Sequence, residues 1–233
     1  PFYDTINANS LQNYFISGAT VKMFDGTDTT TFQELQFDTA GVTASIYVGV
    51  GVTGQVGKTY QLFVNADGQS VHATTSIIQP LPLDSVWYVD APSPNPDSLV
   101  QLMVHYSDPP GYGNYVRYFT KQNSDDYMPG YNSVFDDALI NGTSFDFPLD
   151  RGIDRNIDST FNNYGYFNRG DTIIVKWSAI DKSHFDFWRT LEFELGSTGN
   201  PFASPVKVQS NVVGGLGIWG GYSSSYDTLV VPK

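Results

Sequence analysis

Apolar and polar residues alternate with a period of two over many short stretches of the chain, and this pattern predicts β-strands. The clearest case is a hairpin, in which Tyr60, Leu62 and Val64 share one face of a strand over residues 59–66. Ala66-Asp67-Gly68 has the composition of a tight turn, and the partner strand follows over residues 70–77.

The same alternation predicts further strands along the chain. In 99–107, Val100, Leu102 and Val104 point to one side and the intervening residues to the other, which is typical of a half-buried strand. The Asp108-Pro109-Pro110-Gly111 turn then predicts a second hairpin with residues 114–121. The remaining predicted strands are 19–24, 45–50, 85–89, 144–149 and 172–179, with Ile173, Val175, Trp177 and Ala179 on one face of the last.

One stretch has helical periodicity. Ser183 is a good N-cap with Asp186 three residues later, and Gly196 is expected to end the helix, so a helix is predicted over about 183–195. Its broad apolar face would contain His184, Phe185, Trp188, Leu191 and Leu195.

Two alternating prolines, Pro80 and Pro82, mark the best domain boundary, because neither can donate a ladder hydrogen bond. We therefore predict a mainly β protein with two β-sandwich-like units of the immunoglobulin or transthyretin kind. The first unit would span 1–82, and the second, 83–233, would carry the short helix and a glycine-rich terminal segment.

That glycine-rich segment, residues 210–222, places five glycines among Leu216, Ile218 and Trp219. Glycines beside large apolar groups allow two backbones to approach closely, whereas a flexible linker would combine glycine with serine and lack tryptophan. The segment is therefore predicted to be a buried or docking turn, and it contains no catalytic residue type.

The charge of the chain narrows its partners. The formal net charge is −12, and the only glutamates are Glu34, Glu192 and Glu194. Such a field repels nucleic acid. Cysteine is absent, which excludes thiol nucleophiles and cysteine metal sites, and no apolar run is long enough to cross a bilayer. The chain begins at Pro1 without Met, so we expect an upstream segment.

No residue pattern indicates catalysis. The histidines are isolated, and no nucleophile elbow is present. Glu192 and Glu194 would diverge on the predicted helix, and the pairs Asp125-Asp126 and Asp136-Asp137 are typical of turns. We therefore predict a non-enzymatic protein with no cofactor and no metal centre.

Three further motifs can each be explained either by local structure or by a function. Asp150, Asp154 and Asp158 recur every four residues, which favours a loop over a helix and leaves weak support for Ca²⁺ binding. The tripeptide 169–171 matches an integrin-binding motif but also fits a turn before a strand, and Asn141 begins an N-glycosylation sequon.

Aspartate is followed by serine or threonine unusually often. Turn chemistry explains such pairs, and a bacterial O-glycosylation signal is the alternative. The candidate O-glycosylation residues are Thr5, Thr29, Thr39, Ser85, Ser98, Ser159, Thr172 and Thr228.

The loop over 161–168 combines four aromatic rings with amide side chains. Rings beside asparagine suit carbohydrate stacking, a protein interface or ordinary packing, and the sequence leaves these alternatives open. The candidate docking or ligand-contact residues are Tyr164, Tyr166, Phe167, Trp219 and Tyr222.

Several motifs are similar to those of one known family: the stretches 57–62, 72–75, 108–109, 114–118, 135–137, 141–142, 170–172, 200–202 and 210–221. The chain resembles the domain of unknown function 4249 family from about residue 19 to 222, and 210–221 is the most specific match. The resemblance implies an outer-membrane lipoprotein of Bacteroidota, exposed at the cell surface and commonly paired with a TonB-dependent transporter. It also implies a lipid anchor upstream of Pro1 and the loss of a first strand.

These implications lead to two expectations about function. The first is a non-enzymatic accessory lipoprotein that helps a TonB-dependent transporter to capture a nutrient. The alternative is a stand-alone glycan- or calcium-binding surface module. No catalytic residues are assigned in the family, so none is transferred to this chain.

Overall fold

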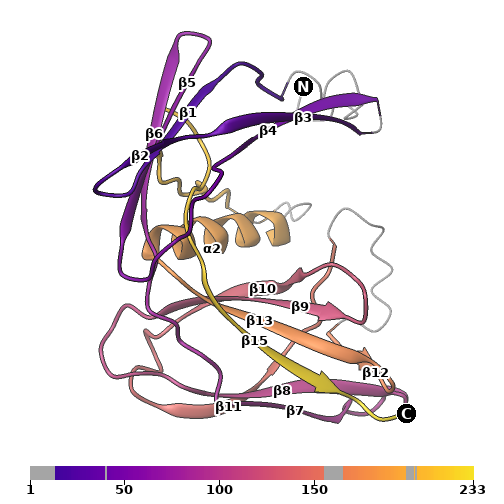
Figure 1. The fold of residues 1–233 in the computed structure, drawn as a ribbon. Helices are drawn as coiled ribbons and strands as arrows, with labels where there is room; N and C mark the ends of the chain where they lie inside the picture. Colours follow the sequence, from indigo (N-terminus) through magenta and orange to yellow (C-terminus); the bar gives the residue numbers. More distant parts are fainter. Residues whose placement is uncertain (1–13, 40, 155–164, 198–201, 203) are drawn as a thin grey trace.

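The part of the chain that the structure describes folds into antiparallel β-sheets and one α-helix, which lies between two of the sheets (Figure 1). The computed structural model describes residues 14–39, 41–154, 165–197, 202 and 204–233. The predicted mainly β fold with one helix near the C-terminus is confirmed within these residues. The elements are β1 (Thr20–Phe24), β2 (Thr29–Thr31), β3 (Gln33–Thr39), β4 (Val42–Val48), β5 (Thr59–Ala66), β6 (Gln69–Ser76), β7 (Ser85–Asp90), β8 (Leu99–Ser107), β9 (Tyr115–Gln122), β10 (Met128–Asp136), β11 (Ser144–Leu149), β12 (Phe167–Asn168), β13 (Thr172–Ile180), α2 (Lys182–Ser197), β14 (Val212–Val213) and β15 (Ser223–Val230).

The first sheet has the strand order β14-β6-β5-β1-β2 and contains the predicted hairpin. Ala66 pairs with Gln69, and the two residues between them have positive φ, 49° at Asp67 and 74° at Gly68. This is the geometry of a tight primed turn, which Asp-Gly favours. Although the predicted boundary falls at residue 82, this sheet also takes β14 from residues 212–213.

The other large unit is a sandwich of two sheets. One has the order β10-β9-β13-β15; in the other, β8 is central, with β7 on one side and β11 followed by β12 on the other. The core between them surrounds Trp177, which is 1% exposed and packs against the rings of Tyr106, Tyr118 and Phe135. The apolar faces predicted for 99–107 and 172–179 are the faces buried here.

The predicted hairpin between 99–107 and 114–121 is wrong. β8 pairs with β7, β11 and β12, whereas β9 pairs with β10 and β13, so the Asp108-Pro109-Pro110-Gly111 loop crosses from one sheet to the other. Two buried carboxylates hold this crossover in place: Asp108 accepts the Gly142 N–H at 3.1 Å, and Asp137 accepts the Gly113 N–H at 2.9 Å. Turn composition predicted the reversal correctly but not the strand to which the chain returns.

Helix α2 covers the outer face of the sandwich at β10 and β9, on the side of the first sheet (Figure 1). It begins earlier than predicted, because the N-cap is Asp181, whose carboxylate accepts the His184 N–H at 2.9 Å. Asp186 bonds Lys182 rather than closing a capping box with Ser183, and the helix continues through Gly196.

The buried face of α2 also differs from the prediction. Leu195 is 50% exposed, and Glu192 is buried instead. Both Glu192 oxygens accept hydrogen bonds from Ser133 of β10, one from the N–H at 2.9 Å and one from the hydroxyl. Glu194 points elsewhere and accepts the Val206 N–H, so the two glutamates diverge as expected.

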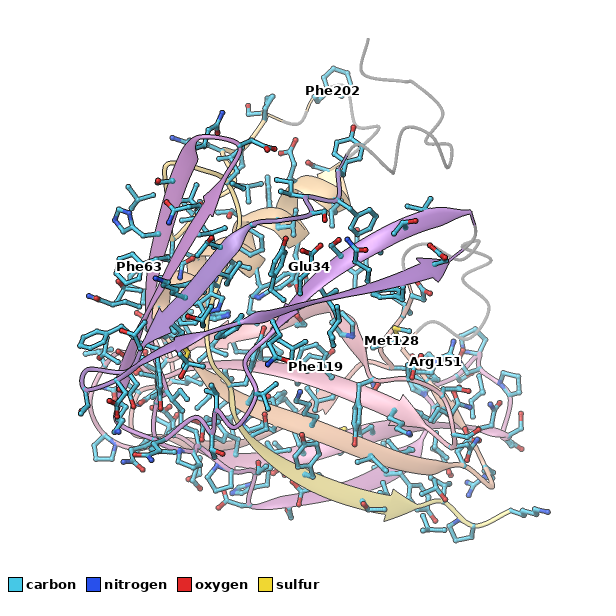
Figure 2. The ribbon with its side chains drawn as sticks, turned by 45° about the horizontal axis from the view of Figure 1, so that its top comes forward. Glu34, Phe63, Phe119, Met128, Arg151 and Phe202 are labelled. Carbon is cyan, nitrogen blue, oxygen red and sulfur yellow. The ribbon has the colours of Figure 1, made fainter. Side chains whose placement is uncertain are left out.

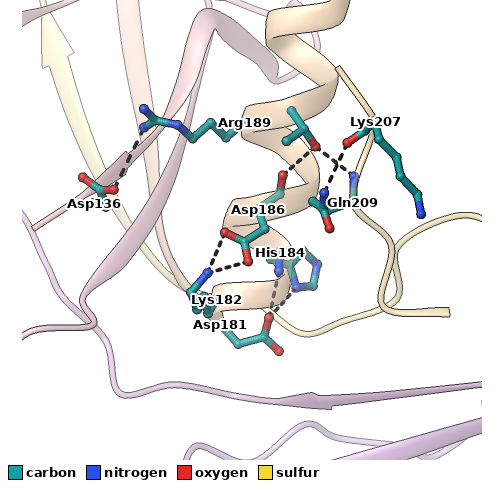
Figure 3. A network of polar contacts seen from close by, with 9 residues as sticks. Asp136, Asp181, Lys182, His184, Asp186, Arg189, Lys207 and Gln209 are labelled. Atoms are coloured by element: carbon teal, nitrogen blue, oxygen red, sulfur yellow. Dashed lines mark hydrogen bonds and ion pairs between the residues drawn. The ribbon is translucent and has the colours of Figure 1, made fainter. Parts of the chain in front are cut away.

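Asp181 joins the sandwich, the helix and the first sheet. It directly follows β13, caps α2, and accepts hydrogen bonds from Thr75 Oγ1 at 2.6 Å and from the Ser76 N–H at 3.2 Å of β6. Figure 3 shows Asp181 and His184 at the start of the helix, where His184 Nδ1 lies 3.5 Å from the carboxylate. Burial alone would raise the pKa of Asp181, but the hydrogen bonds from His184, Thr75 and Ser76 outweigh it and hold the pKa at about 2.

This arrangement predicts acid-sensitive stability. Because the folded-state pKa of Asp181 lies below its unfolded value of 3.8, its contribution is complete above about pH 4 and is lost as the pH falls through about 2. Asp181→Asn should lower the free energy of unfolding by about 2 kcal/mol at pH 7 and flatten its decline between pH 4 and 2. Denaturant unfolding at pH 7, 4 and 2.5 measures both effects.

Asp186→Asn is the matched control, since Asp186 lies on the same helix and makes an exposed i,i+4 pair with Lys182. That pair should contribute less than about 0.5 kcal/mol. Equal losses in the two variants would contradict the role assigned to Asp181.

Candidate functional site

The glycine-rich segment connects α2, the first sheet and the sandwich in turn. After the helix the chain returns along it, where the Gln209 N–H donates to Thr190 Oγ1 at 3.0 Å (Figure 3). Val212 and Val213 then pair with Ala73 and His72 of β6. Beyond the glycines the chain enters β15 of the sandwich. One continuous segment therefore contacts the helix, the first sheet and the sandwich.

Two side chains close the glycine-rich segment into a loop. Asn211 donates to the Trp219 carbonyl at 2.6 Å and accepts the Trp219 N–H at 3.0 Å. The Ser210 hydroxyl donates to the Gly217 carbonyl at 2.8 Å. The backbone N–H and C=O groups of Gly217 and Trp219 are therefore satisfied within the loop, and Trp219 is held in one place.

The glycines permit close packing at two points, as the sequence predicted. A Cβ built on Gly220 would lie 1.6 Å from the His184 ring, and one on Gly221 would lie 2.6 Å from the Ile77 side chain. Only a residue without a side chain fits there. Leu216, at the tip of the loop, is 89% exposed and is a surface residue.

Trp219 lines an open groove on the first sheet, which we call the tryptophan groove. Its volume is about 390 Å³, and its wall is largely apolar. β1 and β5 form the floor with Val21, Leu62 and Val64. The remaining lining residues are Tyr14, Phe15, Ile16, Ala19, Phe32, Ser45, Tyr47, Ala66 and Trp219.

The β3–β4 hairpin holds the segment that forms one wall of the groove. The Tyr47 hydroxyl donates to the Ile16 carbonyl at 2.8 Å and accepts the Ala19 N–H at 2.9 Å. Glu34, labelled in Figure 2, accepts the Gly18 N–H at 2.9 Å. This bond, followed by those from Ser17, Ser45 and Gln36, lowers the pKa of Glu34 to about 2.

The wall exposes three consecutive large apolar side chains. Tyr14 is 76% exposed, Phe15 39% and Ile16 49%. No strand, helix or contact residue was predicted before residue 19, although this apolar triplet was the available signal. The groove thus combines a concave apolar surface with an exposed apolar rim, which is the composition of a binding surface for apolar groups.

The predicted docking or ligand-contact residues lie in different environments. Trp219 lies in the groove, and Tyr222 is half-buried, with its ring 5.1 Å from that of His184 and its hydroxyl bonded to Arg117. Phe167 is 0% exposed within the sandwich core, so its proposed role as a surface contact is incorrect. Tyr166 is half-buried, and Tyr164 lies outside the described residues.

The other motifs have structural roles where they are described. Asp171 of the tripeptide 169–171 is buried and accepts bonds from Gln122 and Asn123, while Arg169 bonds Asp90 and the Asp97 carbonyl. Residues 150–154 are non-helical, as predicted, and Asp158 lies outside the described part of the chain.

His105 pairs at the surface with Asp146, at 2.5 Å. Within the described ranges, no three His, Asp or Glu side chains gather as metal ligands would. No helix among those ranges is long and apolar enough to span a membrane.

The candidate O-glycosylation residues are scattered over several elements. Thr29, Ser85, Ser98 and Thr228 are exposed, and Thr172 is half-buried. Thr39 lies in β3, and Thr5 and Ser159 lie outside the described residues.

Comparison with protein families identifies the chain. The model of the family described as "Domain of unknown function (DUF4249)" matches residues 3–227, nearly the whole sequence. The chain therefore belongs to this family. No curated protein and no solved structure matches it.

The close packing of Gly220 gives a second prediction. Gly220→Ala should lower the free energy of unfolding by about 2–3 kcal/mol, because the new methyl group would overlap the buried His184 ring. Gly215→Ala, in the same loop, is the control, since its Cβ would lie 3.2 Å from the Val71 side chain. Chemical denaturation compares the two variants, and a control loss equal to that of Gly220→Ala would refute the assignment.

Proposed function

We propose that this chain is a non-enzymatic, cell-surface lipoprotein of the outer membrane, an accessory subunit of a TonB-dependent nutrient transporter. The tryptophan groove is its docking site, and the occupant is an apolar segment of the transporter. The choice of partner and location rests on what the family resemblance implies. The choice of surface rests on the groove itself.

The observation that carries this proposal is the apolar rim of the groove. Tyr14, Phe15 and Ile16 stand side by side in the sequence and remain 39–76% exposed beside an apolar concavity. A contiguous apolar surface of this kind costs free energy in water, and a partner that covers it removes that cost. Trp219 is the residue type most often found at the energetic centre of an interface.

The local geometry also suits a docking role. Tyr47 and Glu34 fix the rim segment through its backbone, so its side chains are free to make contacts without new ordering of the chain. The loop bonds from Asn211 fix Trp219 in the same way. Preorganised contact residues lose little conformational entropy on binding.

Copurification tests the proposal. Tagged full-length lipoprotein extracted from its native outer membrane in mild detergent should elute with a β-barrel transporter near one-to-one stoichiometry, measured by quantitative mass spectrometry. Trp219→Ala and Tyr14→Ser should each reduce the retained transporter at least tenfold. This corresponds to the loss of about 1.4 kcal/mol or more of binding free energy.

Tyr112→Ser is the control, since Tyr112 is 77% exposed on the loop between β8 and β9 and lies outside the groove. Tyr14→Ser guards against misfolding, because Tyr14 is 76% exposed. A wild-type protein that elutes alone would refute the accessory role. Full retention by both groove variants would refute the docking site.

A further inference from the structure

The outer face of β9, β13 and β15 carries an unusual combination of cations and rings. Since Val175 and Trp177 of β13 face the sandwich core, Lys176 between them faces outward. The register aligns Phe119 of β9 and Tyr226 of β15 with Lys176, one on each side. Phe119 is labelled in Figure 2.

Lys176 has rings but no acid beside it. Its Nζ lies 5.2 Å from the centroid of the Phe119 ring and 5.6 Å from that of Tyr222. Its ammonium group forms no hydrogen bond or ion pair with any described residue. Burial first, and then the nearby charge of Arg117, lower the pKa of Lys176, and an anion placed beside the ammonium group would favour its charged form.

Arg117 is already engaged and is not itself a contact for a ligand. It is buried beneath Trp188, with its guanidinium carbon 3.5 Å from the ring centroid, and it donates to Ser133 and Tyr222. Its positive charge nevertheless adds to the field at Lys176. The nearest acid on this network, Glu192, is occupied by Ser133.

The same surface continues along the sheet. Lys121 Nζ lies 5.6 Å from the centroid of the Tyr127 ring, and it too forms no ion pair within the described residues. Tyr127 packs edge-on against Tyr226, with the centroids 6.1 Å apart. Tyr226 is 57% exposed, and the neighbouring outward residues of β15 are Ser224 and Thr228. We call this surface the cationic aromatic face; it consists of Phe119, Lys121, Tyr127, Lys176, Tyr222 and Tyr226.

We propose that the cationic aromatic face binds a carboxylated saccharide, such as a chain of uronic acids. The aromatic rings would pack against the apolar C–H faces of the sugars, the two ammonium groups would pair with their carboxylates, and the serine and threonine hydroxyls would bond their hydroxyls. Adjacent strands are about 4.8 Å apart, so Phe119 and Tyr226 are separated by about 10 Å with Lys176 between them. That span accommodates two sugar rings.

The charge of the molecule favours this ligand over a denser polyanion. A net charge of −12 repels acidic peptides and nucleic acids at long range. A uronate chain carries one charge per ring, and its contacts with the rings act only at short range. The inference uses no residue of the tryptophan groove, so it does not depend on the transporter role.

Titration calorimetry with trigalacturonate tests the inference on the intact chain. Binding should be saturable at submillimolar to millimolar concentration and should weaken as the salt concentration rises from 20 to 150 mM. The neutral trisaccharide of galactose should bind at least tenfold more weakly. Lys176→Met, which keeps an apolar stem over the rings, should weaken trigalacturonate binding at least tenfold, and Tyr226→Ala at least fivefold.

Lys207→Met is the matched control, because it removes an exposed lysine from the segment beside α2 and should leave binding unchanged (Figure 3). Tyr226→Ala alters an exposed ring and protects the test against misfolding of the lysine variant. Three results with saccharides would overturn the inference: no saturable binding, equal affinity for the neutral trisaccharide, or equal affinity of the wild type and both variants. Tighter binding of a hexaglutamate peptide than of trigalacturonate would also overturn it.

Discussion

The arrangement of the molecule depends on one carboxylate. Asp181 directly follows β13. Its carboxylate accepts the His184 N–H in the first turn of α2, and it also accepts hydrogen bonds from Thr75 and Ser76 at the end of β6. A hydrogen-bonded carboxylate has directional requirements, so these bonds set the position of the helix relative to both β units. Removal of the charge would leave buried donors at the meeting point of all three, where water cannot replace it without opening the joint.

The C-terminal segment connects the same three parts a second time. It pairs with β6 through Val212 and Val213, packs Gly220 against His184, and ends as an edge strand of the sandwich. As a result Trp219 and Tyr222, only three residues apart, reach two different surfaces, the groove and the cationic aromatic face. The two glycines between them let the backbone pack against His184 and Ile77, which is the close packing that the sequence predicted for this segment.

Sequence patterns predicted what depends on neighbouring residues and failed where distant residues decide. The bounds of β8 and β11, the Asp67-Gly68 turn and the buried face of β13 follow from period-two alternation and local turn geometry. The partner of β9 could not be predicted in this way, because Asp108 and Asp137 direct the loop across the sandwich. Likewise, Asp181 outcompetes Ser183 as the cap because it also binds Thr75, a residue 106 positions away. Phe167 was predicted to be a surface contact because an aromatic loop and the aromatic end of a strand have the same composition. Its pairing with Val100 of β8 is what places it in the core.

The acidity of the chain has a structural explanation that changes how its surface is interpreted. The buried carboxylates of Asp108, Asp137, Asp171 and Glu192 and the half-buried carboxylate of Asp181 all accept hydrogen bonds from loop, strand or helix donors. Some of the acidic residues therefore serve to hold irregular backbone in place through hydrogen bonds, as expected for a β protein with long connections between its sheets. The high acidity of the sequence does not by itself indicate a cation site. Lys176 and Lys121 differ from these acids. Each lies beside aromatic rings, and neither forms an ion pair with an acid among the described residues. In a molecule whose net charge is −12, the local charge of a surface, rather than the average charge of the molecule, decides which ligands that surface can hold.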